Sequence, residues 1–198
     1  GVSLRHIHRH PEPLKPGQKL RDQTQYEDVL NFGIGALRSP DVEVGYQARF
    51  DPNKDAAALW DAFTEDGVLS DLEDDHPSNK GEPIAAAVTV KVNLPPGESR
   101  EIVFALVWDM PVARFPLGTG WYRRYTKFYG RQGDAVSALL SDALTQFTSW
   151  EGEIDAWQMP ILTDEALPLW YRQMLFNETY YLVDGGTIWT AGREGPKD

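Results

Sequence analysis

The most regular hydrophobic pattern lies in the last third of the chain. From Asp134 on, apolar side chains recur at the i, i+3, i+4, i+7 spacing that is typical of an amphipathic helix. We predict a helix of about 24 residues that starts with Asp134 as its N-cap and is interrupted at Gly152. A second helix is expected after Pro160, with Thr163 or Asp164 as its cap. The apolar positions of the two helices are Val136, Leu139, Leu140, Ala143, Leu144, Phe147, Trp150, Ile154 and Trp157, then Leu167, Trp170, Tyr171, Met174, Leu175 and Leu182.

The middle of the chain carries strand patterns. Apolar and polar residues alternate over Val42–Phe50, and segments 84–92 and 100–108 are rich in β-branched and apolar residues. Asn, Pro and Gly residues cluster at 93–98, which indicates a turn. We therefore predict that the two latter segments form an antiparallel hairpin inside a β-sandwich. Apolar residues at helical spacing predict one short helix over 55–63.

The first 40 residues show no regular pattern, because several prolines and glycines interrupt it. We expect irregular chain there, with a short helix near 24–30. His6, His8 and His10 alternate as metal ligands on a strand would. No carboxylate stands at a matching position and prolines follow, so an exposed loop is favoured over a metal site. We expect no metal and no cofactor.

Composition narrows the function classes. The formal net charge of -11 excludes nucleic-acid binding by general electrostatic attraction, because phosphates would be repelled. The basic residues at 123–124 and 127–131 are interpreted as solvated surface charge or charge at a domain interface. There is no cysteine, so disulfides are excluded and the composition suits a reducing compartment. No apolar run approaches the roughly 18 residues of a membrane-spanning helix, and no signal peptide is visible. The chain begins with Gly1 rather than Met, so we expect an internal piece of a longer protein.

Glu178 has the most informative position of the carboxylates. It lies seven residues after Tyr171, four after Met174 and three after Leu175, so helical spacing places it on their apolar face. A buried carboxylate destabilises a protein unless it is paired or hydrogen-bonded. From spacing alone, a structural acid bonded to a tyrosine or to Arg172 is favoured over a catalytic group.

Longer motifs change that balance. Residues 175–189 read LFNETYYLVDGGTIW, and residues 108–111 and 122–130 read WDMP and YRRYTKFYG. The first motif resembles the signature of the non-lysosomal glucosylceramidase (bile acid β-glucosidase) family, glycoside hydrolase family 116. The other two are similar to the interdomain segment of that family, and the resemblance extends over residues 80–190. Thr179 and Tyr181 depart from it, since apolar residues are expected at both positions.

The resemblance implies a fold that is mixed β then α. Residues 1–110 would be part of an N-terminal β-sandwich, 111–133 an interdomain crossing segment, and 134–198 the start of a helical (α/α)6 catalytic domain. It also implies hydrolysis of β-glucosides, including glucosylceramide, with retention through a glycosyl-enzyme intermediate.

The same resemblance implies roles for single residues. The glutamate of the family's Asn-Glu motif is its nucleophile and stands at Glu178, and we expect Asp184, Thr187 and Trp189 to bind substrate. The family's acid/base aspartate would lie after Asp198, so we expect this chain alone to be inactive. The expected partners are the glucoside or glucosylceramide and, peripherally, the cytosolic face of the ER, Golgi or plasma membrane; the protein would otherwise be cytoplasmic.

Two other function classes remain open on sequence. The chain could be a non-catalytic carbohydrate- or partner-binding β-sandwich with a helical appendage, which would use its aromatic surface and not need Glu178. It could also be a scaffold in which the aromatic residues of 121–129 form the interface between sandwich and helices. The aglycone and the oligomeric state are left open.

Overall fold

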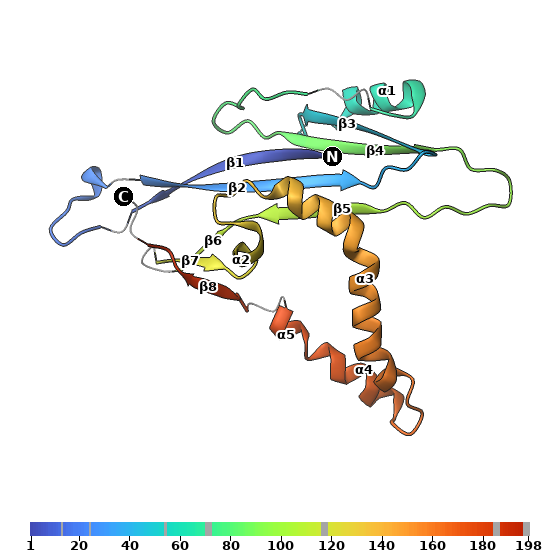
Figure 1. Cartoon of the computed structure of the whole chain (residues 1–198). Coiled ribbons are helices and arrows are strands. Elements are labelled where there is room, and N and C mark those ends of the chain that lie inside the picture. The colour runs from blue at the N-terminus through green and yellow to red at the C-terminus, as the bar shows by residue number, and fades with distance from the viewer. Residues whose placement is uncertain are drawn as a thin grey trace.

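The computed structural model of the chain is mixed β then α: a β-rich part is followed by an elongated helical arm (Figure 1). It describes residues 1–12, 14–23, 25–53, 55–69, 73–115, 119–183 and 187–195. The strands are β1 (Val2–Pro11), β2 (Gln25–Ala36), β3 (Val42–Phe50), β4 (Ala85–Val92), β5 (Phe104–Asp109), β6 (Val112–Arg114), β7 (Gly120–Arg123) and β8 (Thr190–Arg193). The helices are α1 (Ala57–Asp66), α2 (Thr126–Tyr129), α3 (Val136–Leu162), α4 (Leu169–Asn177) and α5 (Tyr180–Val183), with a 3-10 turn η1 (Leu20–Asp22).

The strands form three antiparallel sheets, in the orders β1-β2-β5, β3-β4 and β6-β7-β8. The first two sheets contact each other through β1 and β2 of one sheet and β4 and β3 of the other. The third sheet is small and joins segment 111–133 to residues 190–193, because β8 pairs with β7. The strand predicted over Val42–Phe50 is confirmed as β3, and the helix predicted over 55–63 is confirmed as α1.

The prediction of irregular chain and a short helix in the first 40 residues is wrong. β1 and β2 pair from Val2 opposite Ile34 to Pro11 opposite Gln25. The prolines lie at the end of β1 and beyond it, so they terminate the strand and do not prevent it. The histidines at positions 6, 8 and 10 consequently lie in a strand and not in a loop.

The glycines of β2 have a packing role that explains the misleading pattern. A Cβ added to Gly33 would meet the side chain of Val136 and lie 3.0 Å from Leu140 Cδ1, and one added to Gly35 would lie 3.5 Å from the side chains of Leu140 and Leu144. At Gly33 the absence of a Cβ allows α3 to lie directly on the sheet, whereas a Cβ at Gly35 would make only an ordinary van der Waals contact. In the sequence these residues look like helix breakers, because their partner is about a hundred residues away.

The predicted hairpin of segments 84–92 and 100–108 is also wrong. β4 pairs with β3, whereas β5 pairs with β2, so the two segments belong to different sheets. Hairpin loops usually have two to five residues. The Asn/Pro/Gly cluster is instead the first part of a longer connection over 93–103 that crosses from one sheet to the other.

The long helix is confirmed, but its ends differ from those predicted. α3 has 27 residues, continues through Gly152 and includes Pro160 in its last turns. A proline there removes only one intrahelical hydrogen bond. The carbonyls at this end are satisfied in other ways, since the Thr163 amide and hydroxyl both donate to Met159 O and Arg172 Nη1 donates to Leu162 O at 2.6 Å. The next helix, α4, has Pro168 at its N-cap position, so neither Thr163 nor Asp164 caps it.

The N-cap of α3 is Ala135 and not Asp134. Its amide donates to Oδ2 of Asp109 at 2.7 Å, and Oδ1 of the same carboxylate accepts the Tyr125 hydroxyl at 2.6 Å. Asp109 ends β5 and is 1% exposed. Opposite it in β2, the side-chain amide of Asn31 donates to Gly133 O. One buried carboxylate therefore joins the sheet, the segment before α2 and the start of α3.

This junction predicts a dependence of stability on alkaline pH. Burial, with the hydrogen bond to Asp109 second, raises the pKa of the Tyr125 phenol well above its usual value. The folded state then holds the proton more tightly than the unfolded state, so the stabilisation is complete below about pH 10 and is lost as the pH rises further. We expect the urea midpoint to fall between pH 10 and 11, and to fall less in Tyr125→Phe than in Tyr180→Phe, an exposed control. Equal falls in the two variants would contradict the assignment.

Candidate active site

Glu178 lies in a tight turn between α4 and α5. It is the C-cap residue of α4, and its backbone amide donates to Phe176 O. The Thr179 amide and hydroxyl donate to the same carbonyl at 3.1 Å and 2.6 Å. The Phe176 ring in turn packs edge-on against Trp157 of α3, with 5.2 Å between the ring centroids. The turn that carries Glu178 is thus fastened to the long helix.

A shallow depression that is open to solvent surrounds this turn. Its lining residues are Phe176, Asn177, Glu178, Thr179, Tyr180 and Tyr181. Glu178 contributes the only carboxylate among these lining residues, all of which the structure describes. Tyr180 and Tyr181 have exposed rings that contact each other edge-on. Aromatic faces beside a carboxylate are suited to a sugar ring.

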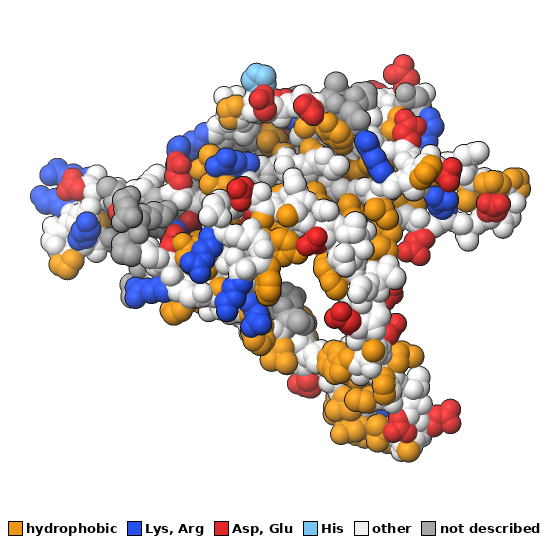
Figure 2. All heavy atoms as spheres, in the orientation of Figure 1, with side chains coloured by type: hydrophobic (Ala, Val, Ile, Leu, Met, Phe, Trp, Pro, Cys, Tyr) orange, Lys and Arg blue, Asp and Glu red, His pale blue; other side chains and the backbone are white. Residues whose placement is uncertain are grey.

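The prediction that Glu178 lies on a buried helix face is wrong. Its side chain is exposed, and so is that of Met174 one turn earlier. The physical reason is that α4 packs mainly against α3, and no second layer in the described part of the chain covers its other side. The apolar side chains of this arm form the orange patch around α4 in Figure 2.

The structural-acid interpretation of Glu178 has no support either. Arg172, its proposed partner, donates instead to Leu162 O at the end of α3. Within the described ranges, the Glu178 carboxylate has neither a hydrogen-bond nor an ion-pair partner. It is therefore available to a ligand from the solvent side.

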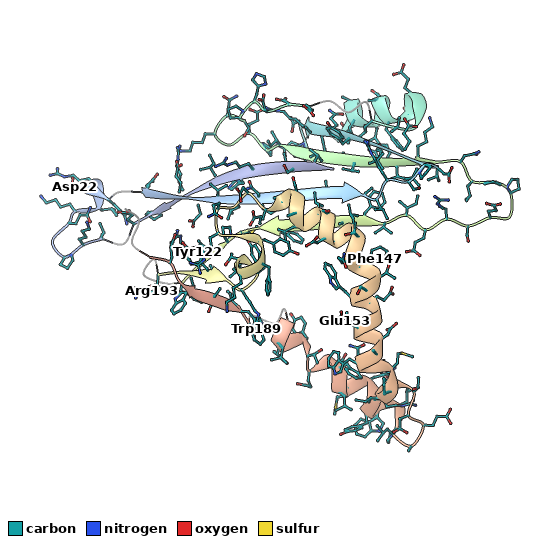
Figure 3. The ribbon with its side chains drawn as sticks, viewed as in Figure 1. Asp22, Tyr122, Phe147, Glu153, Trp189 and Arg193 are labelled. Carbon is teal, nitrogen blue, oxygen red and sulfur yellow. The ribbon has the colours of Figure 1, made fainter. Side chains whose placement is uncertain are left out.

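Thr187 and Trp189, two of the predicted substrate-binding residues, both contact α5. The Thr187 hydroxyl donates to Tyr181 O, and Trp189 Nε1 donates to Leu182 O at 2.7 Å. Trp189 is 51% exposed and lies between α5 and β8 (Figure 3). Its indole N–H is already used, so it offers a ring face to a ligand. Asp184, the third predicted residue, lies outside the described residues.

Trp189 also contacts segment 111–133. Its carbonyl accepts the Arg124 amide at 2.7 Å, and the Arg124 guanidinium lies 5.7 Å from the centre of the indole ring. Among the aromatic residues of 121–129, Trp121 and Tyr122 are part-buried in β7, whereas Phe128 is 75% exposed. This segment therefore touches the return of the chain from the helical arm.

A part-buried ion cluster is not indicated by any sequence pattern. Arg114 donates through Nε and Nη2 to both oxygens of Asp28 at 2.5 Å, and through Nη1 to Glu194 Oε2 at 2.6 Å. The hydrogen bonds to Asp28, ahead of those to Glu194, raise the pKa of Arg114. The partners are 86 and 80 residues away in sequence, so no local pattern could have indicated the cluster.

Potential metal ligands come together at one place in the described part of the chain. Asp74, Asp75 and His76 lie close to one another, and all three are exposed. The pKa of Asp74 is lowered, mainly because its carboxylate accepts the His76 backbone amide. This is a solvated acidic turn and not a built site. His6 on β1 is exposed, and the side chains of His8 and His10 are outside the description.

The described helices include none that is both long enough and apolar enough to cross a bilayer.

A comparison with known families identifies the origin of the chain. The family model for beta-glucosidase 2, glycosyl-hydrolase family 116 N-term, matches residues 1–150. The match includes the first seven strands and the first half of α3, whereas Glu178 lies after it. The domain boundaries at residues 110 and 133 stay predictions. Because the match covers most of the sequence, the chain belongs to glycosyl-hydrolase family 116.

Proposed function

We propose that this chain supplies the nucleophile of a retaining β-glucosidase, and that Glu178 is that nucleophile. The observation that carries the proposal is a solvent-facing carboxylate without a partner, in a depression lined by tyrosines, on a chain of a glycoside hydrolase family. The turn contacts α3 through Phe176 and Trp157, so the residue that carries the carboxylate is anchored to the long helix.

The chemistry requires two carboxyl groups about 5–5.5 Å apart. In the first step a Glu178 oxygen attacks the anomeric carbon while the bond from that carbon to the aglycone oxygen breaks. The second carboxyl group donates a proton to the departing oxygen. In the second step the same group removes a proton from water, which attacks the glycosyl ester, restores Glu178 and releases glucose with the original configuration.

The second carboxyl group is not among the described residues that line the depression, where Glu178 is the only acid. We propose that it comes from polypeptide outside this chain. A water molecule or a weakly acidic leaving group would then have no proton donor or acceptor at the site. The 198-residue chain by itself would therefore not turn over ordinary β-glucosides.

We further propose a lipid aglycone, with glucosylceramide as the candidate substrate and peripheral contact with a membrane. The support is the family resemblance together with the exposed apolar side chains next to Glu178, those of Tyr180, Tyr181 and Leu182. These residues could contact the first carbons of an acyl or sphingoid chain while the sugar reaches the carboxylate.

Turnover by the isolated chain tests the proposal that the second carboxyl group lies outside this chain. We expect no release of glucose from an alkyl β-glucoside above the level seen with Glu178→Gln, because protonation of the poor leaving group and activation of water are both missing. The matched control is Glu151→Gln, which removes an exposed carboxylate from α3. Clear turnover by the chain that Glu178→Gln abolishes and Glu151→Gln does not would show that both carboxyl groups lie within these 198 residues.

A further inference from the structure

We propose that Arg114 is a positioning residue for the candidate active site. With Asp28 and Glu194 it forms an ionic clasp that holds segment 187–194, and so Thr187 and Trp189, against the β-rich part of the chain. The inference depends on the proposed function only for the statement that this segment belongs to the substrate site. The clasp itself is a property of the fold and is tested without catalysis.

The path of the chain explains why a contact at Arg114 can affect the candidate active site. The helical arm leaves the β-rich part at Ala135 and returns to it at Trp189 (Figure 1). The candidate nucleophile lies within this excursion. The relative position of Glu178 and the residues after α5 therefore depends on how the returning segment is fixed.

Segment 187–194, which returns from the helical arm, is hydrogen-bonded to segment 111–133 at several points. Trp189 O accepts the Arg124 amide, β8 pairs with β7, and the Glu194 amide donates to Gly120 O at 2.9 Å. The Glu194 carboxylate then reaches Arg114 on β6. In Figure 3, Arg193 and Tyr122 lie close to each other on the neighbouring strands, which agrees with this pairing.

The ion cluster is largely shielded from solvent, unlike an ion pair on the surface. The Arg114 side chain is 13% exposed, and those of Asp28 and Glu194 are 13% and 15% exposed. A forked arginine contact with a carboxylate is strong and directional. The exposed pair of Arg9 and Glu27 on the neighbouring part of the sheet is the opposite case, in which solvent screens the attraction.

Gly120 is a second, independent indication that the Glu194 carboxylate has a defined position. A Cβ at this position would collide with the Glu194 carboxylate and lie 2.9 Å from Arg114 Nη1. Only glycine leaves room for the carboxylate beside β7. Substitution of Gly120 should therefore displace Glu194 while every charge of the cluster is kept.

Fluorine NMR of the 198-residue chain with 5-fluorotryptophan tests the clasp. The Trp189 line is assigned by its absence in Trp189→Phe. We expect Arg114→Met, Glu194→Gln and Gly120→Ala to shift and broaden that line, while the line of Trp60 on α1 stays unchanged. Amide exchange over 190–194 should accelerate about tenfold in the same variants. Arg114→Lys keeps the positive charge and should shift the Trp189 line less than Arg114→Met does. Glu27→Gln should leave both the line and the exchange unchanged.

The variants separate the possible outcomes. If Arg114→Met unfolds the chain, every tryptophan line moves, and Glu194→Gln and Gly120→Ala then decide, because the first leaves the bond between Asp28 and Arg114 intact and the second keeps all three charges. An unchanged Trp189 line and unchanged exchange in these two variants would overturn the proposal. Failure of Glu178 to react with a glucoside would count against the proposed function and would leave the NMR result standing.

Discussion

Replacement of Asp109 by Ala is expected to lower the free energy of unfolding by about 3 kcal/mol, because two hydrogen bonds to a buried charged group are lost at once. Asp109 is nearly inaccessible, and it accepts both the amide that starts α3 and the Tyr125 hydroxyl. The measurement is urea unfolding at pH 7. Tyr125→Phe removes only one of the two bonds and should have about half the effect.

Asp109→Ala should destabilise the start of α3 more than the rest of the fold. Without this carboxylate, the Ala135 amide at the start of α3 is left unsatisfied, beside the place where Val136 and Leu140 pack on Gly33 of β2. Hydrogen exchange of the first turn of α3 should therefore accelerate more than that of α1. Asp155→Ala, which removes an exposed carboxylate from the middle of the same helix, is the matched control. A loss for Asp109→Ala no larger than for this control would contradict the role of the junction.

Replacement of Glu178 by Gln is expected to reduce kcat at least about 10³-fold in the active polypeptide that contains this chain, since no covalent intermediate can form. Glu178→Ala should regain activity with azide and release α-glucosyl azide, because azide enters from the face that the carboxylate vacates. The product configuration is read by proton NMR. Release of the β-azide would assign Glu178 to the acid/base role, and full activity of Glu178→Gln would exclude both roles.

The parts of the fold that could be predicted are those whose pattern reports directly on local geometry. β3 alternates because one side of a strand faces the other sheet, and the first half of α3 shows an apolar stripe because it lies on β2 and β5, whereas Trp150, Ile154 and Trp157 further along are about half exposed. Both elements have the predicted type and position. Helix ends were less accurate, because the N-cap of α3 is Ala135, whose amide is bonded by Asp109 in another strand, and not the neighbouring Asp134.

The errors have a common cause, which is that the deciding contacts are distant in sequence. Gly33 looks like a breaker until α3 is placed on it, and the strand at 104–109 looks like the partner of its predecessor until β2 is placed beside it. The ion cluster at Arg114 joins three segments that no periodicity connects.

The candidate site shows the same division. The motif around Glu178 indicated the residue, and the structure adds that its turn is held to α3 and that Thr187 and Trp189 return to α5. Helical spacing suggested that Glu178 is buried. Spacing shows which side chains share a helix face, but it does not show whether another element covers that face. In the described part of the chain α3 is the main neighbour of α4, so the carboxylate faces solvent.

The most direct test of the account is the site of covalent labelling by a 2-deoxy-2-fluoro-β-glucoside with a dinitrophenolate leaving group. That group departs without a proton donor, so only the nucleophile is required, and the fluorine slows release of the ester. Peptide mass spectrometry of the active polypeptide should find one fluoroglucosyl group on Glu178 and none in Glu178→Gln. A label on a different carboxylate, or an active enzyme that is never labelled, would contradict the assignment of Glu178 as the nucleophile.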